Sequence, residues 1–216
     1  KAAEDSPCPG GYSNTNGEKL EHKYQNGVCI YCGDLQQADE VDGYYQITNQ
    51  GQLRWFAAKV NSGNSDINAR LMESFAMDDT EWTPIGTEQN PFTGDFNGNG
   101  KTITGLTCTN PSKNHVGLVG DAKGATIQNV TVKDSSLNGK EHIGAVCGYI
   151  IGDTITSCTI TGCTTSGGTV SGRDYIGGIV GEAQNATVQR CFNSGKVTGS
   201  DSIGGIAGQA YDATVQ

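Results

Sequence analysis

The chain has 216 residues and a net charge of −9 at pH 7, which is enough length for one large β domain or two smaller ones. The acidic balance excludes nucleic acid and anionic membrane surfaces as expected partners, because both attract basic patches. No apolar run reaches the roughly 18 residues of a membrane span, so we expect no such span in this chain. Glycine is abundant (32 residues against 5 prolines) without a collagen-like triplet, which indicates many turns or close backbone contacts.

Residues 1–40 are predicted to form a small unit of their own. They contain Cys8, His22, Cys29 and Cys32, and the last two are spaced as C-x-x-C before a glycine. Such a knuckle, joined by a cysteine and a histidine from the preceding loop, supplies the four ligands of a closed tetrahedral zinc site. The phrase HKYQNGVCIYCG also resembles zinc-ribbon-like units of exported proteins from anaerobic bacteria. We therefore predict a structural zinc that does no chemistry; the alternatives are a disulfide between two of the three cysteines, or free thiols.

Residues 41–100 are predicted to cap one end of a β domain and to supply its first strands. In QGQLRWFAAKVNSG the apolar residues recur with helical spacing, which predicts a helix over 50–61 that ends before Gly63. An open end of a repetitive β structure exposes unpaired strand edges and an apolar cross-section, so an amphipathic helix would cover it. The residues expected to face that end are Leu53, Phe56, Ala57 and Val60, with Trp55, Trp82 and Phe92 beside them. An aromatic platform for sugars is the alternative role of these rings.

Residues 101–216 contain a repeat that is incomplete at the C-terminus. The heptads HIGAVCG, YIGGIVG and SIGGIAG occur at 142–148, 175–181 and 202–208, and a looser HVGLVG occurs at 115–120. Short β-like pieces separated by Gly, Ser, Asn and Asp make up each unit, and a helical period is missing from this part of the sequence. Units of this size are typical of the coils of a parallel β-solenoid. The glycines would let the chain bend where a Cβ would collide with the next coil.

The phrases KTITGLTC, ATIQNVTV, DTITSCTI, ATVQRCFN and the final ATVQ align with one another and predict which side chains fill the core. The first predicted inward-facing ladder is Ile103, Ile127, Ile155, Val188 and Val215. The second is Leu106, Val130, Cys158 and Cys191. Because cysteine alternates there with aliphatic residues, we expect free buried thiols in the solenoid, with a Cys158–Cys191 disulfide as the alternative. The cysteines concerned are Cys108, Cys147, Cys158, Cys163 and Cys191.

Two patterns could be mistaken for calcium sites. DFNGNG at 95–100 begins like a calcium loop, but the twelfth position is Leu106 instead of a glutamate, so a tight turn is predicted. An acidic ladder recurs once per coil and is predicted to cap backbone amides of a turn, with calcium bound between coils as the disfavoured alternative. The members of this ladder are Asn114, Glu141, Asp174 and Asp201.

The glycine-rich heptads resemble the GLUG repeat of bacterial surface proteins and of immunoglobulin A peptidases. The segments YYQITNQGQLRWFAAKVNSG, WTPIGT and PFTGDFNGNGKTITGL resemble the usual lead-in to these repeats, so the resemblance covers roughly residues 43–216. It implies a right-handed parallel β-helix at the cell surface that acts as a stalk, spacer or adhesive module. In the peptidases such repeats accompany a separate catalytic domain with a metal-binding histidine-glutamate motif, which this sequence lacks.

The predicted fold class is therefore all-β: a right-handed parallel β-helix (β-solenoid) with a short N-terminal capping helix and a small zinc-ribbon-like unit. We expect no enzyme and no catalytic or cofactor-binding residues, because the aligned repeats place the carboxylates in equivalent turn slots, one per coil, and predict no unique cluster. His115 and His142 share a repeat slot, and a repeated residue is seldom catalytic. The predicted function is a secreted, non-enzymatic bacterial cell-surface module acting as adhesin, stalk or spacer. The alternatives are a carbohydrate-active β-helix enzyme (a polysaccharide lyase or hydrolase) and the non-catalytic part of a larger surface peptidase.

The expected partner is a glycan or protein of a host or neighbouring-cell surface, or a second copy through the open end of the solenoid. The sequence stops within a fifth unit, at YDATVQ, and repeats the interior formula there without change. This predicts that the chain is the N-terminal part of a longer array, or that its C-terminal end stacks on another copy.

Overall fold

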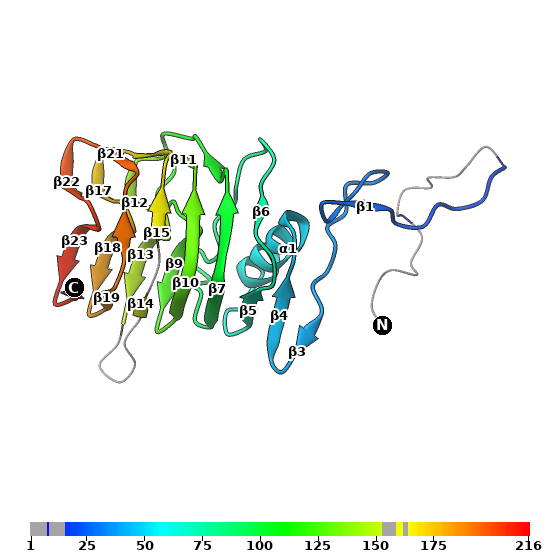
Figure 1. Cartoon of the computed structure of the whole chain (residues 1–216), viewed down its shortest axis with the longest axis horizontal. Coiled ribbons are helices and arrows are strands. Elements are labelled where there is room, and N and C mark those ends of the chain that lie inside the picture. The colour runs from blue at the N-terminus through cyan, green and yellow to red at the C-terminus, as the bar shows by residue number, and fades with distance from the viewer. Residues whose placement is uncertain (1–7, 9–15, 153–158, 162–163) are drawn as a thin grey trace.

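The computed structural model describes residues 8, 16–152, 159–161 and 164–216, and its main body is a parallel β-solenoid. Figure 1 shows the strands of successive coils side by side along the long axis, with the helix near the N-terminal end and the C-terminus at the far end. The predicted all-β fold with a short capping helix is confirmed. Within the described ranges, no helix has the length and apolar character needed to cross a membrane.

The described strands of the solenoid form four sheets and pair in parallel, except for the antiparallel pair β3–β4. The long sheet consists of β3 (Glu40–Val41), β4 (Tyr44–Ile47), β5 (Asn68–Leu71), β6 (Phe75–Ala76), β7 (Asp95–Thr104), β10 (Thr126–Lys133), β14 (Thr159–Thr161), β15 (Thr164–Ser166), β19 (Thr187–Gln189), β20 (Phe192–Asn193) and β24 (Thr214–Val215). The second sheet consists of β8 (Thr107–Cys108), β11 (Ser136–Asn138), β16 (Thr169–Ser171) and β21 (Lys196–Thr198).

The glycine-rich heptads form the corner between the two remaining sheets of the solenoid. The third sheet consists of β12 (Glu141–Gly144), β17 (Asp174–Gly177) and β22 (Asp201–Gly204). The fourth consists of β9 (Val119–Lys123), β13 (Cys147–Ile151), β18 (Val180–Gln184) and β23 (Ala207–Tyr211). A separate antiparallel hairpin of β1 (Tyr24–Gln25) and β2 (Val28–Cys29) precedes the solenoid.

Helix α1 (Gln50–Asn61) has the bounds that the sequence predicts, and it covers the N-terminal end of the solenoid. The side chain of Asn49 caps the helix by accepting a hydrogen bond from the amide of Gln52 at 3.0 Å. The four apolar residues of the predicted stripe are all buried: Leu53, Phe56, Ala57 and Val60. Phe56 meets Phe92 edge to face at 6.1 Å between ring centroids, so helix and first coils share one core.

The predicted aromatic cap is also present. Trp82 is 1% exposed and donates its indole N–H to the carbonyl of Gly117 at 3.0 Å. Trp55 is half-buried and lies edge-on to Tyr45, with 5.2 Å between the ring centroids. Because Trp82 and Phe92 are buried, they serve as core side chains and offer no platform to a sugar.

The glycines of the heptads are required by close approach between coils. A Cβ added at Gly181 would lie 2.5 Å from the carbonyl oxygen of Gly148, one coil earlier, and 2.5 Å from the amide nitrogen of Ile143. At Gly205, in the third heptad, the structure places no described heavy atom within 4 Å of that position. The predicted reason for glycine therefore holds at Gly181.

This difference supplies a matched pair of substitutions. Gly181→Ala is expected to lower the free energy of unfolding by about 1–3 kcal/mol, because backbone atoms of a packed coil cannot move away from the new methyl group. Gly205→Ala should change it by less than about 0.5 kcal/mol. Urea unfolding followed by circular dichroism measures both values. Equal stabilities of the two variants would contradict the proposed packing.

The backbone register corrects the first predicted core ladder. Ile127 pairs with Phe96 in the preceding strand and with Ile160 in the next. The observed ladder is Phe96, Ile127, Ile160, Val188 and Val215. Ile103 is fully buried, as predicted, but it pairs with Val132 and does not share a row with Ile127. Val188 is also fully buried, whereas Val215, which was predicted to face inward, is 42% exposed. The predicted Ile155 lies outside the described residues, and Ile160 holds the place next to Ile127.

The second predicted ladder is corrected in the same way. Leu106 does not lie beside Val130; it stands opposite Ser135, whose hydroxyl accepts the Leu106 amide at 3.1 Å. Val130 precedes Thr131 in β10, and Cys191 precedes Phe192 in β20. Thr131 and Phe192 both pair with Thr164 of β15, so Val130 and Cys191 occupy equivalent positions, as predicted. Cys158 lies outside the described residues.

The solenoid cysteines have different environments. Cys108 is a buried free thiol, as predicted. Cys147 is buried and its Sγ donates to the carbonyl of Tyr149 at 3.3 Å, while the Sγ of the half-buried Cys191 donates to the carbonyl of Gln189 at 3.2 Å. Cys163, like Cys158, lies outside the described residues.

The acidic ladder is in register, but capping accounts for only part of it. Glu141 pairs with Asp174, and Asp174 with Asp201, in successive coils. Asp201 accepts the amide of Ser202 at 2.8 Å, as expected of a cap. Glu141 and Asp174 instead form ion pairs with the guanidinium of Arg173. Protein groups thus bind the carboxylates of Glu141, Asp174 and Asp201. The buried side-chain oxygen of Asn114, the first member of the ladder, has no hydrogen-bond partner among the described residues.

The DFNGNG segment forms a bulged turn within β7, in agreement with the prediction. Asn97 accepts the amide of Asn99 at 2.8 Å, and Asn99 and Gly100 both have left-handed backbone conformations, with φ of 50° and 70°. The carboxylate of Asp95 accepts the hydroxyl of Tyr44 at 2.7 Å and the amide of Gln128 at 3.2 Å. These oxygens therefore bind neighbouring strands.

Candidate functional site

The first candidate site is the cluster of Cys8, His22, Cys29 and Cys32, which the structure brings together as predicted. One ligand atom from each residue lies within 4.8 Å of the others. The β1–β2 hairpin positions Cys29, and its turn uses Asn26 and Gly27 with φ of 50° and 79°, as an Asn-Gly hairpin requires. The amide of Cys8 donates to the carbonyl of Leu20 at 3.0 Å, which places the first thiol next to His22.

The distances within this cluster fit a tetrahedral metal. The sulfurs of Cys8 and Cys29 are 3.5 Å apart, and His22 Nδ1 lies 3.4 Å from the sulfur of Cys8 and 3.5 Å from that of Cys32. Zinc bonds of about 2.3 Å to sulfur and 2.0 Å to nitrogen place neighbouring ligand atoms about 3.5–3.8 Å apart. All three cysteines are free thiols in the structure, so the alternative of a disulfide does not hold there.

The groups around the cluster also suit a metal. His22 directs Nδ1 at the sulfurs, while its Nε2 lies 3.8 Å from a carboxylate oxygen of Asp34. A carboxylate on the outer ring nitrogen orients metal-binding histidines and raises their basicity. This arrangement provides four protein ligands and leaves no open position for a substrate, as in structural zinc sites.

The surroundings of the cluster shift the pKa values of two of its thiols in opposite directions. Burial, followed by the hydrogen bonds and charges of the other two thiols, raises the pKa of Cys8 to about 12. For Cys29 burial acts in the same direction, but backbone amides of Cys32 and Tyr31 hydrogen-bond the sulfur and lower its pKa to about 5. A divalent cation bound here would stabilise the thiolate forms of Cys8 and Cys29 together, because it would place a positive charge beside these two buried sulfurs.

The cluster is joined to the capping helix. The amide of Gly51, in the first turn of α1, donates to the carbonyl of Asn26 at 3.1 Å, and Asn49 donates from its side chain to Gln36 at 3.0 Å. A Cβ at Gly51 would overlap the backbone of Gly27, so the hairpin turn rests directly on the helix. The hairpin that carries Cys29 therefore packs on the outer side of the cap.

The second candidate site is a group of histidines and carboxylates on the face formed by β9, β13 and β18. Asp121 pairs with Tyr149, and Tyr149 with Glu182, so these residues occupy one slot in three successive coils. His115 and His142 occupy the neighbouring slot, as predicted, with 4.8 Å between their ring centroids. Asp121 and Glu182 are each 6% exposed.

Each carboxylate of this group holds one imidazole. His115 Nδ1 lies 2.7 and 2.8 Å from the two oxygens of Asp121, and His142 Nε2 lies 2.8 Å from Glu182. Since a carboxylate accepts, each of these ring nitrogens carries the donated hydrogen. The Tyr149 ring stacks on His115 with 5.5 Å between centroids.

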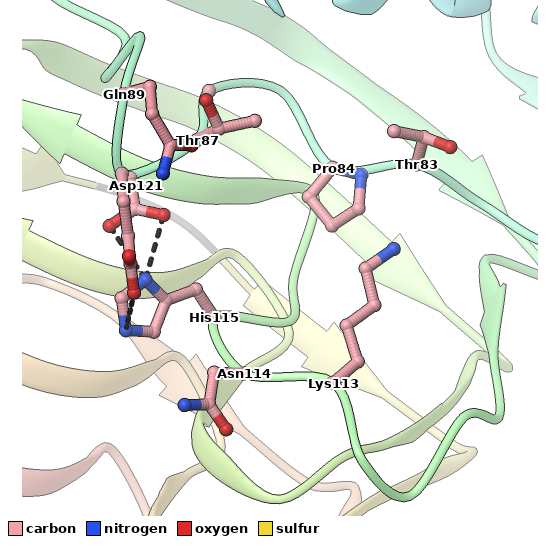
Figure 2. Close-up of a pocket in the computed structure, with 10 residues that line it drawn as sticks. Thr83, Pro84, Thr87, Gln89, Lys113, Asn114, His115 and Asp121 are labelled. Atoms are coloured by element: carbon pink, nitrogen blue, oxygen red, sulfur yellow. Dashed lines mark hydrogen bonds and ion pairs between the residues drawn. The ribbon is translucent and has the colours of Figure 1, made fainter.

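A hollow of about 500 Å³ opens over these pairs, and Lys123 and Gln184 are among its other lining residues. A smaller hollow of about 210 Å³ adjoins it and shares Glu88, His115 and Asp121. Figure 2 shows the smaller hollow, with the His115–Asp121 pair joined by dashed lines on one side and Lys113 on the other.

The two imidazoles differ in their protonation. Burial opposes the charged form of His115, but the hydrogen bond and charge of Asp121 outweigh it and raise the pKa of His115. For His142, burial and the repulsion from His115 lower the pKa despite the contact with Glu182. The pair therefore favours one proton on His115 before any on His142.

This group corrects one expectation from the sequence. The carboxylates do not all occupy one turn slot per coil, because Asp121 and Glu182 form a local group with the histidines that does not repeat along the solenoid. A signal was present in the sequence: in VGDAK, CGYII, VGEAQ and AGQAY the third position changes from Asp to Tyr, Glu and Gln while its neighbours stay small or apolar. This change marks the one slot of the segment that is polar in all four coils and differs from coil to coil.

The fold and the two sites together define a capped parallel β-solenoid with a cysteine–histidine cluster at its N-terminal end. Residues 172–198 match the family model of the GLUG motif, which confirms the predicted resemblance. The chain is 36% identical over 119 residues to Halomucin of Haloquadratum walsbyi (strain DSM 16790 / HBSQ001), a match that covers 51% of this chain and 1% of Halomucin.

A solved structure has the same fold. It is the 1.30 Å crystal structure of a Bacteroides ovatus protein provisionally assigned as an immunoglobulin A1 protease. The two structures superpose with a TM-score of 0.60 and 18% sequence identity, over 82% of this chain and 65% of that one. At this identity the similarity establishes the architecture alone.

Proposed function

We propose that this chain is a non-enzymatic module of a secreted or cell-surface bacterial protein, in which the solenoid acts as adhesin, stalk or spacer. The observation that carries the proposal is the continuous parallel pairing of the long sheet, which runs from β4 to β24. Each coil is hydrogen-bonded to both neighbours, so the coils form one stiff rod. The GLUG motif at 172–198 and the identity to Halomucin support the same role.

We further propose that Cys8, His22, Cys29 and Cys32 bind one structural zinc ion. Their tetrahedral spacing and the carboxylate of Asp34 behind His22 support zinc over a free thiol cluster. The ion would hold the β1–β2 hairpin on helix α1, where so short a segment has little core of its own.

The partners proposed for the rod are glycans or proteins of a host or neighbouring-cell surface, or a second copy that stacks on its C-terminal end. The last described coils expose large apolar side chains: Phe192, Ile203, Tyr211 and Val215. A second copy placed on these coils would cover the apolar side chains and the strand edge together. Sedimentation of a strict monomer would remove the second copy from this proposal.

A surface role predicts that antibodies against the purified protein label intact cells of the organism that makes it. Brief treatment of those cells with an external protease should remove most of the labelling, while an intracellular control protein stays intact. Incubation of the purified chain with pectins, mucin glycans and host glycans should yield no cleavage products. Labelling that appears only after permeabilisation would contradict the location, and released oligosaccharides would contradict the absence of enzymatic activity.

A further inference from the structure

The hollow over the His115–Asp121 and His142–Glu182 pairs is a site whose chemistry can be read from its lining. At about 500 Å³ it has the size of a small-molecule pocket. Its lining contains three carboxylates, those of Glu88, Asp121 and Glu182. The basic groups of the lining are the ammonium of Lys123 and the two imidazoles. This balance disfavours phosphate, sulfate and acidic sugars, because the carboxylates would repel them.

The carboxylates are held in fixed directions. Glu182 accepts hydrogen bonds from His142 and, through its other oxygen, from Gln184 at 2.7 Å. Asp121 is fixed by His115. A carboxylate offers about four acceptor positions, so each group retains acceptors for further donors after these contacts. Preorganised acceptors of this kind suit a ligand rich in hydroxyl groups.

The histidines and carboxylates that line the hollow do not surround a single metal position. In the described part of the chain, the cysteine–histidine cluster at the N-terminal end is the group of His, Cys, Asp and Glu whose ligand atoms all lie within 4.8 Å of one another. The ligand atoms of the present group are spread over three coils instead. Asp121 and Glu182 are two coil steps apart, or roughly 10 Å at the spacing of adjacent strands.

The ring of Tyr149 lies between the two carboxylates in the coil that separates them. Its apolar ring and polar hydroxyl match the two aspects of a sugar, which has a C–H face and a rim of hydroxyl groups. A ligand that contacts both carboxylates must be longer than one pyranose ring, because it has to cross the middle coil.

We propose that this hollow binds two consecutive units of an uncharged glycan, with Asp121 and Glu182 accepting hydrogen bonds from sugar hydroxyls and Tyr149 contacting the intervening ring face. This inference rests on the proposed surface function, to which it adds the ligand class and the binding face. It assigns the contact with glycans to one side of the rod, over β9, β13 and β18.

The test begins with the full chain on an array of neutral, sialylated and sulfated glycans. Titration calorimetry with the best neutral oligosaccharide and with its monosaccharide follows. We expect binding to neutral oligosaccharides, weaker binding of the monosaccharide, and little binding of the acidic glycans. Preference for the acidic glycans, or no glycan binding at all, would overturn the inference while leaving the surface location unaffected.

Two substitutions localise the site. Asp121→Asn and Glu182→Gln are each expected to weaken binding by about 10–100-fold, because each removes a charged acceptor of a hydroxyl group. The matched control is Gln209→Ala, which alters the same slot one coil further on and outside the hollow, and should leave the affinity unchanged. Unchanged affinity in both carboxylate variants, measured on folded protein, would overturn the inference.

A third variant covers the case in which the buried carboxylates are needed for folding. Lys123 is exposed at the rim, so Lys123→Trp should obstruct the hollow without disturbing either histidine pair. We expect it to weaken binding at least about tenfold with an unchanged circular dichroism spectrum. Full affinity in this variant would place the glycan elsewhere. Recovery of shortened glycan from the titrations would overturn the non-enzymatic function but leave the binding site in place.

Discussion

Replacing Ile127 by aspartate is expected to prevent the solenoid from folding. Ile127 is fully buried and pairs with Phe96 on one side and Ile160 on the other. The new carboxylate would stand between two coils without a counterion, and the apolar contacts of the isoleucine would be lost as well. The expected cost is more than about 4 kcal/mol, which approaches the total stability of many domains.

The matched control for this substitution is Asn129→Asp in the same strand. Asn129 is exposed and has φ of 54°, a conformation that aspartate tolerates. The substitution should therefore change the free energy of unfolding of the protein by less than about 0.5 kcal/mol. Thermal unfolding followed by far-ultraviolet circular dichroism distinguishes the two variants. If Ile127→Asp melted at the temperature of the parent protein, the register of β7, β10 and β14 described above would be wrong.

Replacing Cys32 by serine is expected to remove the zinc and to loosen the N-terminal unit. The parent protein should contain one zinc per chain by elemental analysis, and the variant close to none, because structural zinc contributes roughly 10–16 kcal/mol to such small units. Trypsin should then cut after Lys23 at least about tenfold faster than in the parent. The circular dichroism of the solenoid should stay the same, since Cys32 lies outside its coils.

Cys108→Ala provides the control for thiol loss, because Cys108 is a buried free cysteine of the solenoid. It should keep one zinc per chain and the protease resistance of the parent. Absence of zinc from the parent protein, or a Cys29–Cys32 disulfide found by mass spectrometry, would refute the metal assignment.

The two candidate sites differed in how far the sequence could predict them. The cysteine–histidine cluster was predictable, because Cys29 and Cys32 are close in sequence and metal ligation restricts the residue types that can join them. The second group depends on contacts between coils. His142 and Glu182 are 40 residues apart, and only the pitch of the solenoid brings them to 2.8 Å.

By itself, the sequence determined the features that depend on local spacing. The helical period of Leu53, Phe56 and Val60 specified α1 and its buried face, since a helix needs only its own residues to define that stripe. The repeated heptads specified coils that approach closely at glycine, as the contacts around Gly181 show. Both patterns involve residues that are close together in the sequence, within one helix or one corner of a coil.

Only the tertiary structure decided the register between coils. The phrase T-I-T occurs twice in DTITSCTIT, at 154–156 and 159–161, and both copies have the alternation of a half-buried strand. The second copy pairs with Ile127, and the bulge at Asn99 and Gly100 likewise sets Phe96 beside Ile127 in place of Ile103. The physical reason is that parallel partners are joined by a whole coil, so the lengths of its corners and loops determine which residues meet, and these lengths leave no mark on the local alternation of side chains.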